Sequence, residues 1–100
     1  MIGRRWHGRV PSSKAAEYLK LMASVGLPDY RSIEGNEGAW CLHRREGEIV
    51  HVEMFTLWDD LEAVRGFAGD NIALAKYYEF DPDFLIELEA KVTHFEVIEG

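Results

Sequence analysis

Four histidines and three tryptophans are the residues of this 100-residue chain whose chemistry first suggests a functional site. The histidines are His7, His43, His51 and His94, and each falls in a different predicted strand. Imidazole titrates near neutral pH and binds zinc, copper or iron, so these residues point to acid–base chemistry or to a metal site. No two of them have a spacing on one helix or hairpin that fixes chelation, so we expect no metal.

His7 and His51 are the predicted general bases. Gly8 follows His7, and a glycine in a strand lets a ligand or another backbone approach closely. We therefore predict that His7 or His51 takes a proton from a phenol or an enol while Trp58 stacks on the substrate ring. The alternatives are histidines that are satisfied within a protein interface and a tryptophan that only seals the core.

The stretch that must position these residues runs from Ile49 to Gly69. Residues 49–57 are rich in β-branched and aromatic types, which predicts a strand. An aspartate at 59 or 60 with Glu62 after it predicts the start of a helix near residue 60, and Gly69 predicts its end. Strand, bulky Trp58 junction and short helix thus form one unit.

The remaining sequence echoes this unit and adds a last strand. The expected elements are a strand at 3–10, a helix that starts at Ser12 or Ser13 and stops at Gly26 and Pro28, a loop at 27–38, a strand at 39–44, a hairpin turn at 45–48, a short helix at 72–78, a turn at 80–84 and a strand at 92–98. This order predicts one domain, residues 1–100, with a ferredoxin-like α+β sandwich. Its four-stranded antiparallel sheet carries both helices on one face.

Alternation along the strands assigns side chains to the two faces of this sheet. On the first strand, Trp6 and Val10 share one face and His7 lies on the other. In the hairpin, apolar patterning predicts Trp40 and Leu42 on the face of the residues Val50, Val52, Met54 and Thr56, and it predicts Cys41 and His43 on the face of His51, Glu53 and Phe55.

The face that the helices leave open is predicted to carry Phe55, Leu57, Phe95 and Val97. A bare apolar face of several hundred Å² is rarely exposed to water. We therefore predict a homodimer joined sheet to sheet, with the helices outside.

Composition limits the class of protein. A hydrophobic content of 47% with 29% charged residues is typical of a globular domain. The net charge of −7 makes nucleic acid an improbable partner, because phosphate binding needs clustered positive charge. No apolar run reaches the roughly 20 residues of a membrane span, and the lone Cys41 fits a reducing compartment, so we expect a cytoplasmic protein with no membrane partner.

In layout, the chain resembles the antibiotic biosynthesis monooxygenase (ABM) family of dimeric α+β barrels. The resemblance is sharpest in FTLWDDLEAVRGFAG, where an apolar strand ends in tryptophan before a short helix, and it extends to RRWHG, KYYEFD and HFEV. It implies a homodimer and, by analogy with the best-understood members, oxygenation of phenolic polycyclic substrates without a cofactor. This fold also hosts other chemistries.

Only one of the three pocket residues of the family is retained in this sequence. The pocket tryptophan of the family corresponds to Trp58, whereas its asparagine falls on Met54 and its tyrosine on Val64. Two hydrogen-bonding side chains, which would stabilise a substrate oxyanion, are thus replaced by apolar ones.

The functional residues of the haem-degrading branch of the same fold have no counterparts in this sequence. Its tryptophan falls on Phe67, its haem-ligating histidine on Tyr77 and its first-strand asparagine on Trp6 or His7, so none of the three is retained. Tyrosinate can also ligate haem iron, which keeps haem binding as a remote alternative.

Together these observations predict a small homodimeric, oxygenase-like enzyme without tightly bound cofactor that deprotonates an aromatic or polycyclic phenol. A non-catalytic small-molecule binder or a structural dimer is the competing class, and an isomerase or decarboxylase would need the same base. The residues predicted to contact substrate are Trp6, Tyr18, Met54, Phe67, Tyr77 and His94.

Overall fold

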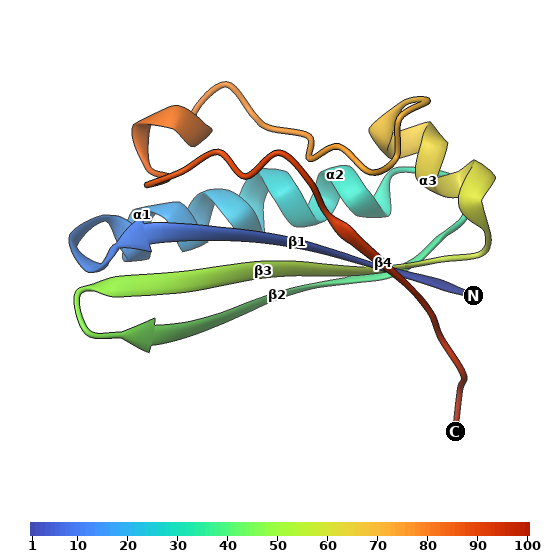
Figure 1. Ribbon diagram of the computed structural model, residues 1–100, viewed down its shortest axis with the longest axis horizontal. Helices are drawn as coiled ribbons and strands as arrows, with labels where there is room; N and C mark the ends of the chain where they lie inside the picture. The colour runs from blue at the N-terminus through green and yellow to red at the C-terminus, as the bar shows by residue number, and fades with distance from the viewer.

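The computed structural model describes all 100 residues, and it contains four strands, a helical layer and a long irregular segment (Figure 1). The strands are β1 (Ile2–Pro11), β2 (Asn36–Glu46), β3 (Ile49–Trp58) and β4 (Thr93–Glu96). The helical elements are α1 (Ser12–Leu21), the π-helix η1 (Met22–Gly26), α2 (Leu27–Arg31), α3 (Leu61–Ala68) and the 3-10 helix η2 (Asp81–Asp83).

The sheet has the order β2-β3-β1-β4, and every neighbouring pair is antiparallel. At its centre β1 and β3 pair along their whole length, from Ile2 opposite Trp58 to Pro11 opposite Ile49. This is the strand order of the ferredoxin-like α+β sandwich, so the predicted fold class is confirmed.

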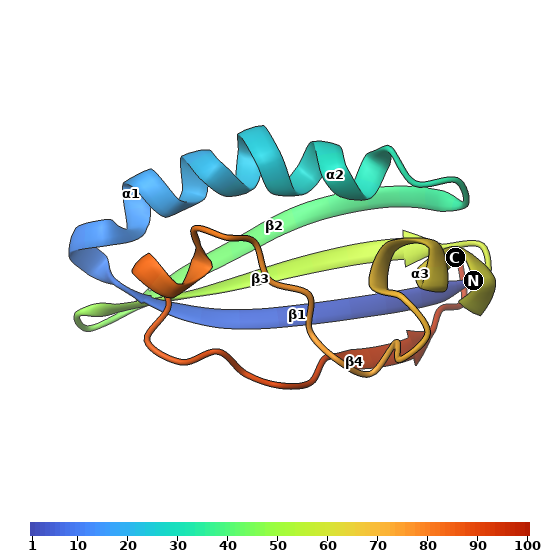
Figure 2. The same ribbon diagram turned by 90° about the horizontal axis from the view of Figure 1, so that it is seen from above.

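One side of the sheet is covered by a helical run and by an irregular segment. The helical run from α1 to α2 lies on this side, and residues 69–92, which we call the covering segment, lie on the same side (Figure 1). Seen from above, the covering segment runs beside the helices over β1 and β4 (Figure 2). Only the short α3 and the single turn η2 stand where a second long helix would complete the layer.

The core fills the space between the sheet and these covering elements. Along β3 alternate residues are buried, from Val50 to Trp58, because only one face of the strand packs against the helices. Trp58 is fully buried, and its indole Nε1 donates a 2.8 Å hydrogen bond to the Thr56 hydroxyl.

The first helical run does not stop at Gly26 and Pro28, as the sequence predicted, but continues to Arg31. Pro28 has no N–H to give to an earlier carbonyl, and the helix accommodates this by widening: the N–H of Leu27 bonds to Met22, five residues back. Most of the expected loop at 27–38 is therefore helix and strand. Even with this continuation, no helix is both long and apolar enough to cross a lipid bilayer.

The predicted faces of the hairpin were wrong. Glu46 pairs with Ile49 across a two-residue turn in which Gly47 takes a φ of 61°, and this register places Trp40 opposite Phe55 and Cys41 opposite Met54. The turn, and not the apolar pattern of β2, fixes the register. Trp40 and Leu42 therefore point away from the helices, whereas His43 lies on the face opposite to that of His51, contrary to the prediction.

The short helix expected at 72–78 is absent. Residues 73–75 instead lie antiparallel to residues 90–92, with backbone hydrogen bonds from Ala75 to Ala90 and from Val92 to Ala73. These bonds join two distant segments, so the Ala73 carbonyl and the Ala75 N–H are not available to a helix. The last strand is also shorter than expected, at Thr93–Glu96.

The start of α3 matches the sequence closely. Asp60 is the N-cap, since its carboxylate accepts a 2.9 Å hydrogen bond from the N–H of Ala63, and Gly69 ends the helix with a φ of 84°. Glu62 does not return to the cap, because it pairs with Arg65 one turn on.

The cap gives a direct test of this local structure. Asp60→Ala removes the acceptor of the Ala63 amide and should lower the free energy of unfolding by about 1 kcal/mol. Urea denaturation followed by circular dichroism measures the change. Asp59→Ala is the matched control, because no N–H of the helix donates to the Asp59 side chain; an equal loss in both variants would contradict the assignment.

Candidate functional site

A chain of four hydrogen-bonded side chains lies on the sheet face that points away from the helices. His7 of β1 and His51 of β3 are diagonal neighbours, with His7 Nε2 3.0 Å from His51 Nδ1 and with stacked rings whose centroids are 5.3 Å apart. Glu89 lies 2.8 Å from His7 Nδ1, and Glu46 lies 3.2 Å from His51 Nε2. We call Glu89, His7, His51 and Glu46 the histidine chain.

Pairing of the strands and one contact from the covering segment position the histidine chain. Antiparallel alternation puts both histidines on the outer face, and Glu46 ends the adjacent strand β2. Glu89 is held in place because its backbone carbonyl accepts a hydrogen bond from the Tyr77 hydroxyl. The two predicted bases are therefore brought together, with a carboxylate at each end.

Counting protons shows what this arrangement can do. Its three links need three N–H protons, whereas two neutral imidazoles supply only two. If Nδ1–H of His7 donates to Glu89 and Nδ1–H of His51 donates to His7, then Nε2 of His51 keeps a free lone pair. A third proton at this atom completes the bond to Glu46.

The carboxylate that faces this atom is an anion. The hydrogen bond with His51, together with the nearby Arg44, lowers the pKa of the Glu46 carboxyl, so Glu46 stays anionic. Beside His51 lies an open hollow of about 240 Å³, lined by Leu42, His43, Arg44, His51 and Glu53. This hollow leaves open space beside the His51 side chain.

The predicted partner of these bases, Trp58, is not beside them. It is fully buried on the helix side of the sheet, where it packs 5.9 Å from Phe67, centroid to centroid. Trp6, Tyr18 and Met54 lie on that side as well. The sheet therefore separates residues that the sequence analysis assigned to a single site.

Three of the predicted contact residues do converge on one interior cavity. It has a volume of only about 10 Å³ and is lined by Trp6, Tyr18, Met54, Met22, Tyr30, Lys76, Tyr78 and Asp81. The Tyr18 hydroxyl donates a 2.8 Å hydrogen bond to Asp81, and burial raises the pKa of the Asp81 carboxyl above its usual range. The cavity is an aromatic enclosure for one water-sized group.

Two further predicted residues lie at the edge of this interior. Tyr77 packs edge-on against Trp6, with ring centroids 6.1 Å apart. His94 lies opposite Arg4 on β1, and burial together with the Arg4 charge lowers the pKa of its imidazole.

Sequence reasoning missed Glu46, Glu89, Arg4 and Asp81. A two-residue hairpin turn would have placed Glu46 beside β3. Glu89 and Asp81 belong to the covering segment, which has no periodicity to assign their direction. Arg4 is buried at a position where alternation predicts an inward side chain, but its charge argues for exposure.

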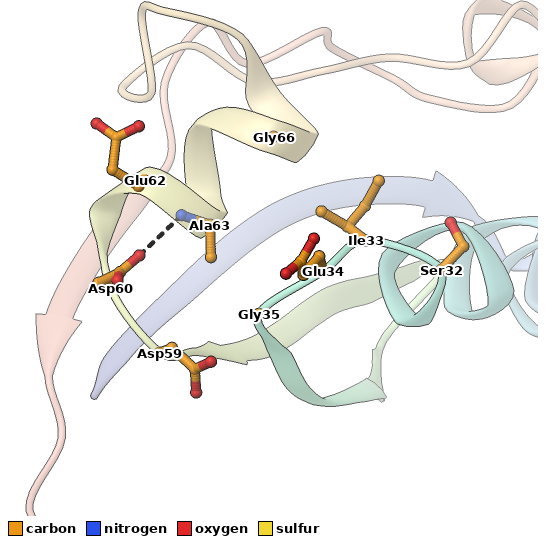
Figure 3. A pocket seen from close by; sticks show the side chains of 9 residues that line it. All are labelled: Ser32, Ile33, Glu34, Gly35, Asp59, Asp60, Glu62, Ala63 and Gly66. Atoms are coloured by element: carbon orange, nitrogen blue, oxygen red, sulfur yellow. Dashed lines mark hydrogen bonds between the residues drawn. The ribbon is translucent and has the colours of Figure 1, made fainter.

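The largest hollow of the structure is acidic (Figure 3). It has a volume of about 530 Å³ and is lined by Glu34, Asp59, Asp60 and Glu62, together with Ser32, Ile33, Gly35, Ala63 and Gly66. No group of three or more His, Cys, Asp or Glu side chains is arranged to hold a metal ion. The neighbouring Asp59 raises the pKa of Glu37, as expected for two close carboxylates, and the hollow contains no base with an orienting partner.

Comparison with known proteins identifies the fold. No protein-family model matches the sequence, and no curated protein matches it. The structure is similar to a provisionally named antibiotic biosynthesis monooxygenase from Bacillus cereus, with a TM-score of 0.65, 15% sequence identity and coverage of 99% of this chain and 94% of that one. It is also similar to Rv0793 from Mycobacterium tuberculosis, with a TM-score of 0.64, 13% identity and coverage of 100% and 98%. The resemblance to the ABM proteins is thereby confirmed at the level of the fold.

Proposed function

We propose that this protein is a homodimeric, oxygenase-like enzyme that deprotonates a phenolic or enolic aromatic substrate and uses no tightly bound cofactor. The single observation that carries the proposal is the histidine chain, in which each imidazole has a carboxylate partner. The reaction class is also supported by the similarity in fold to the Bacillus cereus protein that is provisionally named an antibiotic biosynthesis monooxygenase.

His51 is the base and His7 its positioning residue. The substrate O–H gives its proton to the free Nε2 of His51, and the resulting imidazolium donates to Glu46. His7 receives the Nδ1–H bond of His51, and Glu89 keeps His7 in the tautomer that can accept it. Glu46 thus accepts a hydrogen bond from the proton that His51 takes up.

Once deprotonated, the substrate is an electron-rich anion able to pass an electron to dioxygen. The part of the protein in that step is to bind, orient and shield the anion. The hollow beside His51 is open to solvent in one chain, so shielding depends on a second chain.

The apolar side chains of the outer face support such a dimer. Trp40, Leu42 and Phe95 are 47%, 51% and 43% exposed, and Phe55, Leu57 and Val97 lie on the same face. Trp40 and Leu42 enlarge the patch beyond the sequence expectation, because the hairpin register turns them outward. A sheet-to-sheet dimer would bury this patch and close the hollow over the histidine chain.

The second candidate is a non-catalytic dimer that binds a small molecule. It is favoured by the apolar residues Met54 and Val64, which stand where the family resemblance places an asparagine and a tyrosine that would stabilise a substrate oxyanion. Dimer formation without oxygen uptake towards any phenol would select this candidate.

The histidine chain predicts how activity should respond to substitution. In an oxygen-uptake assay against a panel of phenols, His51→Gly should lower the rate about 100-fold or more, and added imidazole should restore part of it. Glu89→Gln should lower the rate less, since Glu89 acts only through His7.

Glu79→Gln is the matched control for Glu89→Gln, because Glu79 is exposed and belongs to the same covering segment. Its rate should equal that of the unmodified protein. Wild-type rates in His51→Gly, with no response to imidazole, would rule out His51 as the base.

The dimer is tested separately by its apolar patch. Leu42→Glu places a charge in the patch and should yield a monomer in size-exclusion chromatography with light scattering. Val25→Glu is the control, because Val25 is 38% exposed on the helical layer, away from the patch, and this variant should stay dimeric. A wild-type chain that is monomeric at all concentrations would refute the dimer.

A further inference from the structure

Arg4 is a buried cation without a carboxylate partner. It is 1% exposed on the helix side of β1, and no Asp or Glu oxygen lies within 4.0 Å of its guanidinium. One terminal nitrogen donates a 3.2 Å hydrogen bond to the carbonyl of Leu74, but Nε has no partner. An unpaired buried charge is costly, so a residue of this kind calls for a compensating group.

Two more unpartnered polar atoms lie on the same face of the sheet. Trp6 is two residues further along β1 and 4% exposed, and its indole Nε1 has no hydrogen-bond partner. His94 lies directly opposite Arg4 on β4, and its buried Nε2 is also unpartnered. Three buried nitrogens on neighbouring positions therefore lack acceptors, whereas most buried polar groups in proteins are satisfied.

The nearby carboxylates are already committed. Asp81 accepts hydrogen bonds from the Tyr18 hydroxyl and from the backbone N–H of Tyr78. Asp29 accepts from the Tyr78 hydroxyl and lies 3.5 Å from Lys76. No residue of the chain therefore neutralises Arg4.

Aromatic rings surround the same group. The Arg4 guanidinium lies 5.4 Å from the centroid of the Phe67 ring, and the Lys76 ammonium lies 4.3 Å from it. Tyr30 stacks on Phe67 at 4.4 Å and also faces Arg4. The environment thus combines positive charge, N–H donors and flat apolar surfaces.

We propose that Arg4, Trp6 and His94 form a binding site for the carboxylate of a small aromatic acid. The guanidinium is planar and offers its donors in a fork that matches the two oxygens of a carboxylate. Trp6 Nε1 and His94 Nε2 supply further donors, and Tyr30 and Phe67 are positioned to pack against the ring. This site lies across the sheet from the histidine chain and does not depend on the proposed oxygenase activity.

The covering segment gives the ligand its way in. The adjacent cavity of about 10 Å³ is too small for a benzene ring, and Lys76, Tyr78 and Asp81 of the covering segment form part of its wall. Apart from the single turn η2 and the bridge between Leu74 and Lys91, this segment has no regular backbone pairing. Outward movement of residues 76–81 would enlarge the cavity without breaking a strand of the sheet, at the cost of the Tyr18–Asp81 and Tyr78–Asp29 hydrogen bonds.

Benzoate and its uncharged analogue benzamide test the proposal by isothermal titration calorimetry and thermal unfolding at fixed ionic strength. Benzoate should bind and raise the Tm, and benzamide should bind at least about tenfold more weakly. Arg4→Met should weaken benzoate binding at least about tenfold. Arg4→Lys, which keeps the charge but loses the fork, should lie between the two.

Arg5→Met is the matched control, because Arg5 is the next residue of β1 and points to the opposite face. Its affinity for benzoate should equal that of the unmodified chain. In the wild type, benzoate should also raise the pKa of His94 followed by NMR, a readout that does not depend on any variant folding. Equal binding of acetate would overturn the aromatic part of the assignment, and no benzoate response in the wild type would overturn all of it.

Discussion

The pairing of β1 with β3 is the constraint on which the rest of the structure depends. It runs without a bulge from Ile2 opposite Trp58 to Pro11 opposite Ile49, so the alternation of the two strands stays in phase. Trp6 and Met54 consequently face the helices together, and His7 and His51 face outward together. A slip of one residue in β3 would turn His51 towards the helices and would turn the core residues Val50, Val52 and Met54 outward.

What could be predicted from the sequence follows from local patterns. The β3 strand, the Asp60 cap and the Gly69 end depend on neighbouring residues, and the structure retains them. The hairpin faces depended on whether the turn or the apolar pattern of β2 set the register. Trp40 looks like a core residue in the sequence, and only the two-residue turn shows that it points outward. The continuation of the helix past Pro28 needed a π-turn, which no local signal predicted.

Only those residues of the candidate site that lie on regular strands could be predicted from the sequence. His7 and His51 have directions fixed by alternation, so their placement on one face could be deduced. Glu89 could not, because the covering segment is irregular and its backbone bonds go to distant residues such as Ala73 and Arg9. The same irregularity hides Asp81. In this fold an irregular segment largely replaces the second covering helix, so no periodic pattern indicates where its side chains point.

The two faces of the sheet differ in whether a positive charge on them has a carboxylate partner. On the outer face, His7 and His51 have a carboxylate at each end of their pair, so Glu89 and Glu46 stabilise a cation formed there. On the inner face Arg4 carries a permanent charge, and the acidic groups near it bind tyrosines and Lys76 instead. The outer face thus pairs a positive charge with carboxylates, whereas the inner face holds one that has no carboxylate partner.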